Sequence, residues 1–244
     1  FTGDNQGNWG SIFVHLLPYI EQKMLYDSYD WNRSDITGQK DIRMNVIATY
    51  VCPSDNHPPT FQIPLAEAAG IGPNRVVALH NYAASAGPSN LAKNSKCYCA
   101  QDWNSFSSGT YWERNNWPGP FNRLGIPCAL NEIRDGLSNT IFFGEVRPLC
   151  SMHAERGWED SCNGSGYHST IIPINFDTCT RDSTDNCSRH CNWHTSAGFK
   201  SAHTGGAQFL FGDGAVRMIP ETIDHWLYQY LGAKADGEIV SKEF

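Results

Sequence analysis

Residues 201–219 read SAHTGGAQFLFGDGAVRMI, and this stretch decides the fold of the last part of the chain. Two apolar-rich runs, residues 209–211 and 215–219, flank a Gly-Asp-Gly triplet. Glycine supplies the positive φ angles that a tight turn between antiparallel strands needs, so the sequence predicts a β-hairpin. We interpret His203, Asp213 and Gly214 as a structural signature, because a turn Asp typically bonds nearby backbone amides and a His before Gly-Gly closes a loop.

Outside this hairpin, the hydrophobic pattern predicts a domain of the α+β class. Residues 11–29 carry apolar side chains at helical spacing, with Ser11 as cap and a kink or a new helix expected at Pro18. Further helices are expected at residues 41–50 and at about 222–231, the second ended by Gly232. Strands are expected at residues 76–79, 140–146, 209–211, 215–219 and 238–240. This order predicts an N-terminal helix packed on an antiparallel β-sheet.

Two long segments, at about residues 85–127 and 150–200, show little periodicity. Structureless loops of that length are uncommon in a compact domain, so we expect irregular insertions that are stapled covalently. No Pro-rich or Gly/Ser-rich linker separates two halves, and we expect one domain over residues 1–244.

Cysteine supplies the expected staples, since the chain has nine cysteines and eight of them fall between positions 97 and 191. The disulfide candidates are Cys97, Cys99, Cys128, Cys150, Cys162, Cys179, Cys187 and Cys191. We expect local pairs such as Cys150 with Cys162, and one pair among Cys179, Cys187 and Cys191. The odd count leaves at least one thiol unpaired within a monomer, or pairs it with another chain.

The composition also bounds the partners. Only 18% of the residues are charged, and the chain contains 22 Gly and 13 Pro, which is typical of loop-rich extracellular proteins. A net charge of −7 without any basic run argues against a nucleic-acid partner.

Two groups of side chains between residues 177 and 194 have the chemistry of metal ligands. Cys187, Cys191, His190 and His194 are spaced for zinc, although the CxxC knuckle is absent and a disulfide cluster is the favoured interpretation. Asp177, Asp182 and Asp185 offer oxygen ligands on a loop, so calcium is an optional ion in a protein that requires no cofactor. A solvated acidic loop is the plainer alternative.

Two functions compete with a purely structural role. The carboxylates of Glu145, Glu155, Glu159 and Asp160 could serve a secreted glycoside hydrolase, although no nucleophile elbow occurs. A secreted carbohydrate-binding module could use the aromatic residues of the first insertion, which are Trp103, Tyr111, Trp112 and Trp117. Three sequons, at Asn32, Asn163 and Asn186, are candidate glycosylation sites in segments expected to be loops.

Further segments match a known family in order along the chain. They are LPYIEQ with LY after it (17–26), CPSD (52–55), NY (81–82), IRDGLSNT (133–140), GE (144–145), and WL with LG (226–232). To these is added the C-terminal signature, in which nine residues separate His203 from Asp213-Gly214. With these segments the chain resembles the domain of unknown function 1559 family, planctomycete-type pseudopilin-like proteins. The resemblance spans nearly the whole chain and implies a pilin-like head.

The resemblance also implies a role. We expect a non-enzymatic extracellular or cell-surface structural subunit, similar to a type IV pilin or a type II secretion pseudopilin, which assembles with other pilin-like subunits or copies of itself. Residues 1–7 are polar, and no run of about 18 apolar residues occurs, so membrane contact is expected only through an N-terminal helix absent from this sequence. Carbohydrate is an alternative partner.

Overall fold

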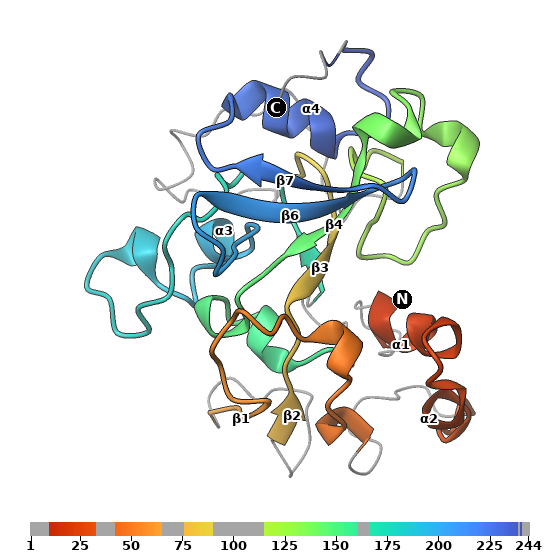
Figure 1. Ribbon diagram of the computed structural model, residues 1–244, viewed down its shortest axis with the longest axis vertical. Helices are drawn as coiled ribbons and strands as arrows, with labels where there is room; N and C mark the ends of the chain where they lie inside the picture. Colours follow the sequence, from red (N-terminus) through yellow and green to blue (C-terminus); the bar gives the residue numbers. More distant parts are fainter. Residues whose placement is uncertain are drawn as a thin grey trace.

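The computed structural model describes residues 10–32, 42–64, 76–89, 115–160, 166–238 and 240. A five-stranded sheet with the order β5-β3-β4-β6-β7 forms its centre (Figure 1). The strands are β3 (Tyr82–Ser85), β4 (Ile141–Glu145), β5 (Tyr167–His168), β6 (Gly206–Phe211) and β7 (Val216–Pro220). A separate pair is formed by β1 (Thr60–Gln62) and β2 (Val76–Ala78). The α+β class is confirmed, but the sheet is mixed, because β5 runs parallel to β3.

The hairpin predicted from residues 201–219 is confirmed. Strands β6 and β7 pair antiparallel, and Leu210 lies opposite Val216 at the last step before the turn. In the turn, Gly214 has a φ of 86°, which glycine adopts without strain. The Asp213 carboxylate accepts a hydrogen bond from the amide of Ala215 at 2.9 Å, so it closes the turn as expected of a turn Asp.

The N-terminal helix is interrupted near Pro18, as expected. Helix α1 (Ile12–Leu16) leads into a 3₁₀ turn, η1 (Leu17–Tyr19), and α2 (Lys23–Asp27) follows. Ser11 caps α1, since its hydroxyl accepts a hydrogen bond from the amide of Phe13 at 3.0 Å. The apolar stripe is covered only in part: Phe13 and Leu17 are buried, whereas Met24 is 89% exposed. Met24 continues the apolar spacing of residues 11–29 but is not covered, because the chain changes direction before α2.

Several other expectations need correction. Residues 41–50 do not form one helix, and their described part contains two 3₁₀ turns, η2 (Ile42–Met44) and η3 (Ala48–Tyr50). Glu238 and Val240 lie outside any strand, and residue 239 lies outside the described residues. Strands β1, β3 and β5 were not predicted, because they have four residues or fewer and show no clear alternation.

The last helix, α4 (His225–Gly232), is confirmed; the Asp224 carboxylate caps it by accepting from the amides of Trp226 and Leu227. The second irregular region contains several short elements besides β5. They are η8 (Pro148–Cys150), η9 (Ala154–Arg156), η11 (Asn186–Ser188) and α3 (Trp193–Ser196), while η6 (Leu130–Glu132) and η7 (Leu137–Asn139) precede β4. None of the helices in the described part of the chain has the length and apolar character needed to cross a bilayer.

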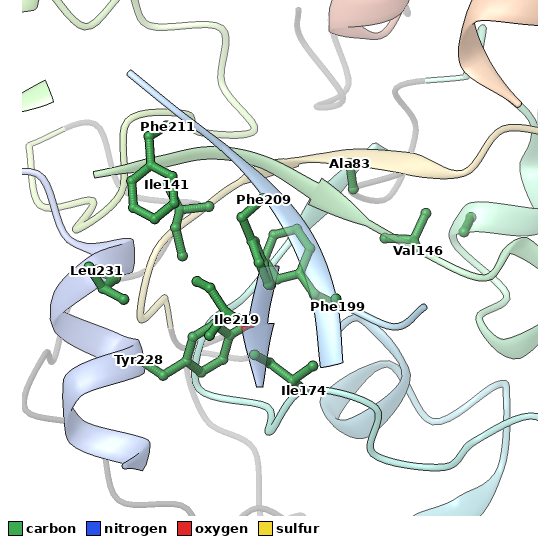
Figure 2. Close-up of a cluster of buried hydrophobic side chains, with 12 residues drawn as sticks. Ala83, Ile141, Val146, Ile174, Phe199, Phe209, Phe211, Ile219, Tyr228 and Leu231 are labelled. Atoms are coloured by element: carbon green, nitrogen blue, oxygen red, sulfur yellow. The ribbon is translucent and has the colours of Figure 1, made fainter. Parts of the chain in front are cut away.

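The main core lies between the sheet and α4. Figure 2 shows Tyr228 and Leu231 of α4 pointing toward Phe209 and Ile219 of the hairpin. A second core lies around α1, where Phe13 and Leu17 pack with Trp158 and touch Phe143 of β4. The helix α1 and the helix α4 therefore bury different parts of the sheet.

Disulfide pairing differs from the expected local pairs. Cys150 is bonded to Cys179, so the expected pair of Cys150 with Cys162 was wrong. Cys187 is also disulfide-bonded. Cys128 and Cys191 are free thiols instead of disulfide partners, and so is Cys52, which is buried. Cys97, Cys99 and Cys162 lie outside the described residues.

Histidines occur in the interior, which the sequence did not indicate. His80, between β2 and β3, is fully buried, and neither of its ring nitrogens has a hydrogen-bond partner among the described residues. Its ring packs edge-on against Phe13, with the ring centroids 5.0 Å apart. Burial, with a smaller contribution from the charge of His57, lowers the pKa of His80 to about 3. His80 is therefore neutral in the folded protein at neutral and mildly acidic pH.

The turn geometry predicts the effect of replacing Asp213. The substitution Asp213→Ala should lower the free energy of unfolding by about 1–2 kcal/mol, because the amide of Ala215 loses its acceptor. Chemical denaturation measures this difference. Asp213→Asn, which keeps an acceptor oxygen, is the matched control and should cost less; equal stability of the wild type and the alanine variant would contradict the structural role.

The buried His80 predicts a specific pH dependence. In the unfolded chain its pKa is near 6.5, so between about pH 6.5 and pH 3 only the unfolded state gains this proton, and stability falls on acidification. His80→Phe should remove about 1.4 kcal/mol per pH unit from that slope. Urea denaturation of both proteins between about pH 4 and pH 8 tests this. Parallel curves over the whole range would show that His80 is not held neutral by burial.

Candidate functional site

Segments that carry the family resemblance meet at one end of the sheet, around the side chain of Asn81. Its carboxamide oxygen accepts from the amide of Cys52 and contacts Nε2 of His57, both at 2.9 Å. Its amide nitrogen donates to Asp55 Oδ2 at 2.9 Å and to the carbonyl of Val146 at 3.2 Å. Asn81 therefore joins the loop of residues 52–57 to the end of β4.

A charged pair strengthens this junction. Nε of Arg147 lies 3.4 Å from Oδ1 of Asp55, whose side chain is almost completely buried. One oxygen of Asp55 thus accepts a hydrogen bond from Asn81, and the other accepts one from Arg147. A buried carboxylate needs such partners, and their loss would leave its charge uncompensated.

Three reactive side chains come together beside this junction. Cys52 contributes its thiol from the loop, Glu145 its carboxylate from the end of β4, and His203 its imidazole from the segment before β6. Nε2 of His203 lies 3.3 Å from Oε1 of Glu145 and 3.8 Å from Sγ of Cys52. Cys52 and Glu145 are buried, and about a third of the His203 side chain is exposed.

The cluster borders a groove of about 340 Å³. Besides the three cluster residues, the groove is lined by Pro53, Ser54, Tyr82, Phe143, Gly144, Gln208, Phe209, Leu210 and Val216. Most of these side chains are apolar, and several come from β4, β6 and β7. All three cluster side chains border this groove, and His203 also borders a second groove of about 410 Å³.

The geometry distinguishes between two kinds of chemistry. In a Cys-His-Glu relay, the imidazole uses one nitrogen for the nucleophile and the other for the orienting carboxylate. Here Cys52 and Glu145 both approach Nε2 of His203, so the arrangement is unsuited to a relay. A metal ion needs donor atoms that face one point. Among the described residues this cluster is the one group in which three such atoms lie within 4.8 Å of one another.

The two parts of the His203–Asp213 signature lie at opposite ends of β6. His203 precedes the strand and contacts Glu145 and Cys52, whereas Asp213 lies in the turn that follows it. Nη2 of Arg217 lies 3.7 Å from Oδ2 of Asp213. The two signature residues therefore have separate tasks, and only His203 belongs to the cluster.

Several of the predicted metal ligands near residue 180 make other contacts in the structure. Asp177 accepts from the amide of Cys179, and Asp185 accepts from the amide of Cys187, an interaction that lowers the pKa of Asp185. Asp177, Asp182 and Asp185 do not form a three-donor group in the described part of the chain, and calcium there stays a prediction. The zinc alternative loses Cys187, whose sulfur is in a disulfide.

The carboxylates considered for hydrolysis are mostly neutralised in the interior. Glu155 pairs with Arg181, and Asp160 pairs with Arg156. Glu159 is buried beside Tyr29, whose pKa is raised by burial and by the charge of Glu159.

The aromatic residues considered for sugar binding are only partly described. The ammonium of Lys234 lies 3.6 Å from the ring centre of Trp117, so one face of this ring is covered. Trp103, Tyr111 and Trp112 lie outside the described residues. Of the sequon residues, Asn32 and Asn186 are exposed, while Asn163 lies outside the described residues.

The convergence of these motifs does not follow from the sequence. Cys52, Asn81 and Glu145 each occur in a segment that carries the resemblance, but nothing in their spacing shows that they meet. One signal was present, because Cys52 is the single cysteine outside residues 97–191.

The chain was compared with known families, curated proteins and solved structures. The family described as "Protein of unknown function (DUF1559)" matches residues 1–225. No curated protein and no solved structure matches the chain. Since the family match covers most of the sequence, the chain belongs to the DUF1559 family.

Proposed function

We propose that this chain is a non-enzymatic structural subunit of an extracellular or cell-surface assembly, similar to a pseudopilin, which associates with copies of itself or with related subunits. The observation that carries the proposal is an open apolar face on the terminal hairpin. Val216 is 61% exposed and Met218 is 42% exposed, and both belong to β7. We call Leu210, Val216 and Met218 the hairpin face.

The alternation of the strands explains why this face is open. Side chains along a strand point to opposite sides, and Ile219 points into the core beneath α4. Val216 and Met218 therefore point to the other side, where Val216 is paired with Leu210 across the hairpin. On that side α1 packs against Phe143 of β4. The hairpin face lies beyond this contact and stays exposed.

Exposed apolar surface of this kind favours association. Burying a large aliphatic side chain contributes about 1.5–3 kcal/mol, and contiguous apolar patches on soluble proteins commonly mark contact surfaces. The hairpin face continues into the groove, since Leu210 and Val216 also line it. A neighbouring subunit could thus cover the hairpin face and the groove together.

Two further observations support a structural and extracellular role. The Cys150–Cys179 disulfide is typical of proteins in oxidising compartments. The ion pairs of Glu155 and Asp160 withdraw both carboxylates from acid–base chemistry on a substrate.

Assembly through the hairpin face can be tested by crosslinking in cells that produce the protein. A photo-crosslinking amino acid at Val216 should join the chain to a second copy or to another pilin-like subunit, because the contact buries this residue. Leu130 is the matched control, since it is similarly exposed at 63% but lies in η6 and belongs neither to the hairpin face nor to the lining of the groove. Mass spectrometry identifies the products.

The second part of this test is the oligomeric state of the isolated chain, measured by sedimentation. We expect it to sediment as a folded monomer or weak oligomer, since three side chains alone bury too little area for a stable interface. Crosslinks from position 130 but not from position 216, or no crosslink from either, would contradict assembly through the hairpin face.

A further inference from the structure

We propose that Cys52, Glu145 and His203 form a binding site for a divalent transition metal of the zinc class. The ligand atoms are Sγ of Cys52, Oε1 of Glu145 and Nε2 of His203, and a water molecule from the groove completes the coordination. The proposal is independent of assembly, because it concerns three side chains of one chain.

Two of the three separations between the ligand atoms are close to those around a single zinc ion. Tetrahedral zinc, with bonds of about 2.0–2.1 Å to nitrogen and oxygen and about 2.3 Å to sulfur, separates its ligand atoms by about 3.3–3.6 Å. The nitrogen–oxygen separation of 3.3 Å falls in this range, and the nitrogen–sulfur separation of 3.8 Å needs only a small contraction. The third pair, sulfur and oxygen, lies within 4.8 Å.

Each ligand residue is also held by a neighbour. The second oxygen of Glu145 accepts from the amide of Gln208 at 2.8 Å, which turns Oε1 toward the cluster. The amide of Cys52 donates to Asn81 at 2.9 Å, and the amide of His203 donates to Ser201 Oγ at 3.0 Å. Such supporting hydrogen bonds orient the ligands of metal sites and tune their affinity.

The donor set selects the class of metal. A thiolate sulfur is a soft ligand that magnesium and calcium do not prefer, whereas zinc accepts sulfur, imidazole nitrogen and carboxylate oxygen together. Three protein ligands leave one position of a tetrahedron, and the exposed part of His203 lies at the groove. Water can therefore reach the fourth position.

The site would connect three distant segments. Cys52 lies in the loop after η3, Glu145 ends β4, and His203 precedes β6. An ion bound by all three stabilises the folded state over the unfolded chain, in which no such site exists. It also gives the buried thiol of Cys52 a partner that is not another cysteine.

Cobalt and zinc binding to the purified full chain test the proposal. After treatment with a chelator, the protein should bind one equivalent of Co²⁺ and show a near-ultraviolet thiolate-to-cobalt charge-transfer band, which Zn²⁺ abolishes by displacement. Cys52→Ser should remove the band, and His203→Asn should weaken Zn²⁺ binding by at least about 100-fold, the upper end of what loss of a supporting residue does. Circular dichroism and thermal melts without metal verify that both variants fold.

Cys191→Ser is the matched control, since Cys191 is a free thiol near His190 and His194 but far along the chain from Cys52. It should keep the charge-transfer band and the Zn²⁺ affinity. Loss of the band in Cys191→Ser, its retention in Cys52→Ser, or the absence of stoichiometric binding by the wild type would each overturn the proposal. If folding fails for Cys52→Ser, the His203→Asn affinity and the control decide.

Discussion

The rest of the site depends on the hydrogen bonds of the Asn81 carboxamide. A buried carboxamide has two donors and an acceptor that must be paired, and here they are paired with four partners from two other segments. This fixes the backbone of Cys52 and the carboxylate of Asp55 next to the end of β4. Without the Asn81 side chain the loop of residues 52–57 would keep the Asp55–Arg147 contact but lose three hydrogen-bonding contacts, and no regular secondary structure holds it beside Glu145.

The central sheet supplies the other half of the arrangement. Strand β4 pairs with β3 and β6, so Glu145 lies between the two, with Tyr82 as its partner on β3 and Gln208 bonded to its carboxylate on β6. Helix α4 packs on one side of this sheet, and α1 covers part of the other. The helices leave the groove and the hairpin face uncovered. Ligand access and subunit contact would therefore share one surface of the molecule.

The sequence predicts those parts of the fold that are local. The hairpin, its turn at Asp213 and the cap at Ser11 each follow from a short pattern and are confirmed, as is a helix near residues 222–231, although Gly232 is its last residue and Ala233 is the C-cap. The short strand β3 could not be predicted, since its stability comes from pairing with β4 and β5, which are distant in sequence. The same holds for the cluster, whose three residues are separated by more than 50 positions each. The Cys150–Cys179 bond was missed because loop length favours near neighbours, whereas the fold decides which sulfurs meet.

Asn81 holds the loop of residues 52–57 in place, and a double-mutant cycle tests this role most directly. The free energies of unfolding of Asn81→Ala, Asp55→Ala and the double variant give the coupling between the two side chains. We expect a coupling of about 1–3 kcal/mol, as found for residues in one buried hydrogen-bond network. The distant pair of Asn81 and Asp213 should be additive within about 0.5 kcal/mol. Additivity of Asn81 with Asp55, within the same margin, would contradict the account.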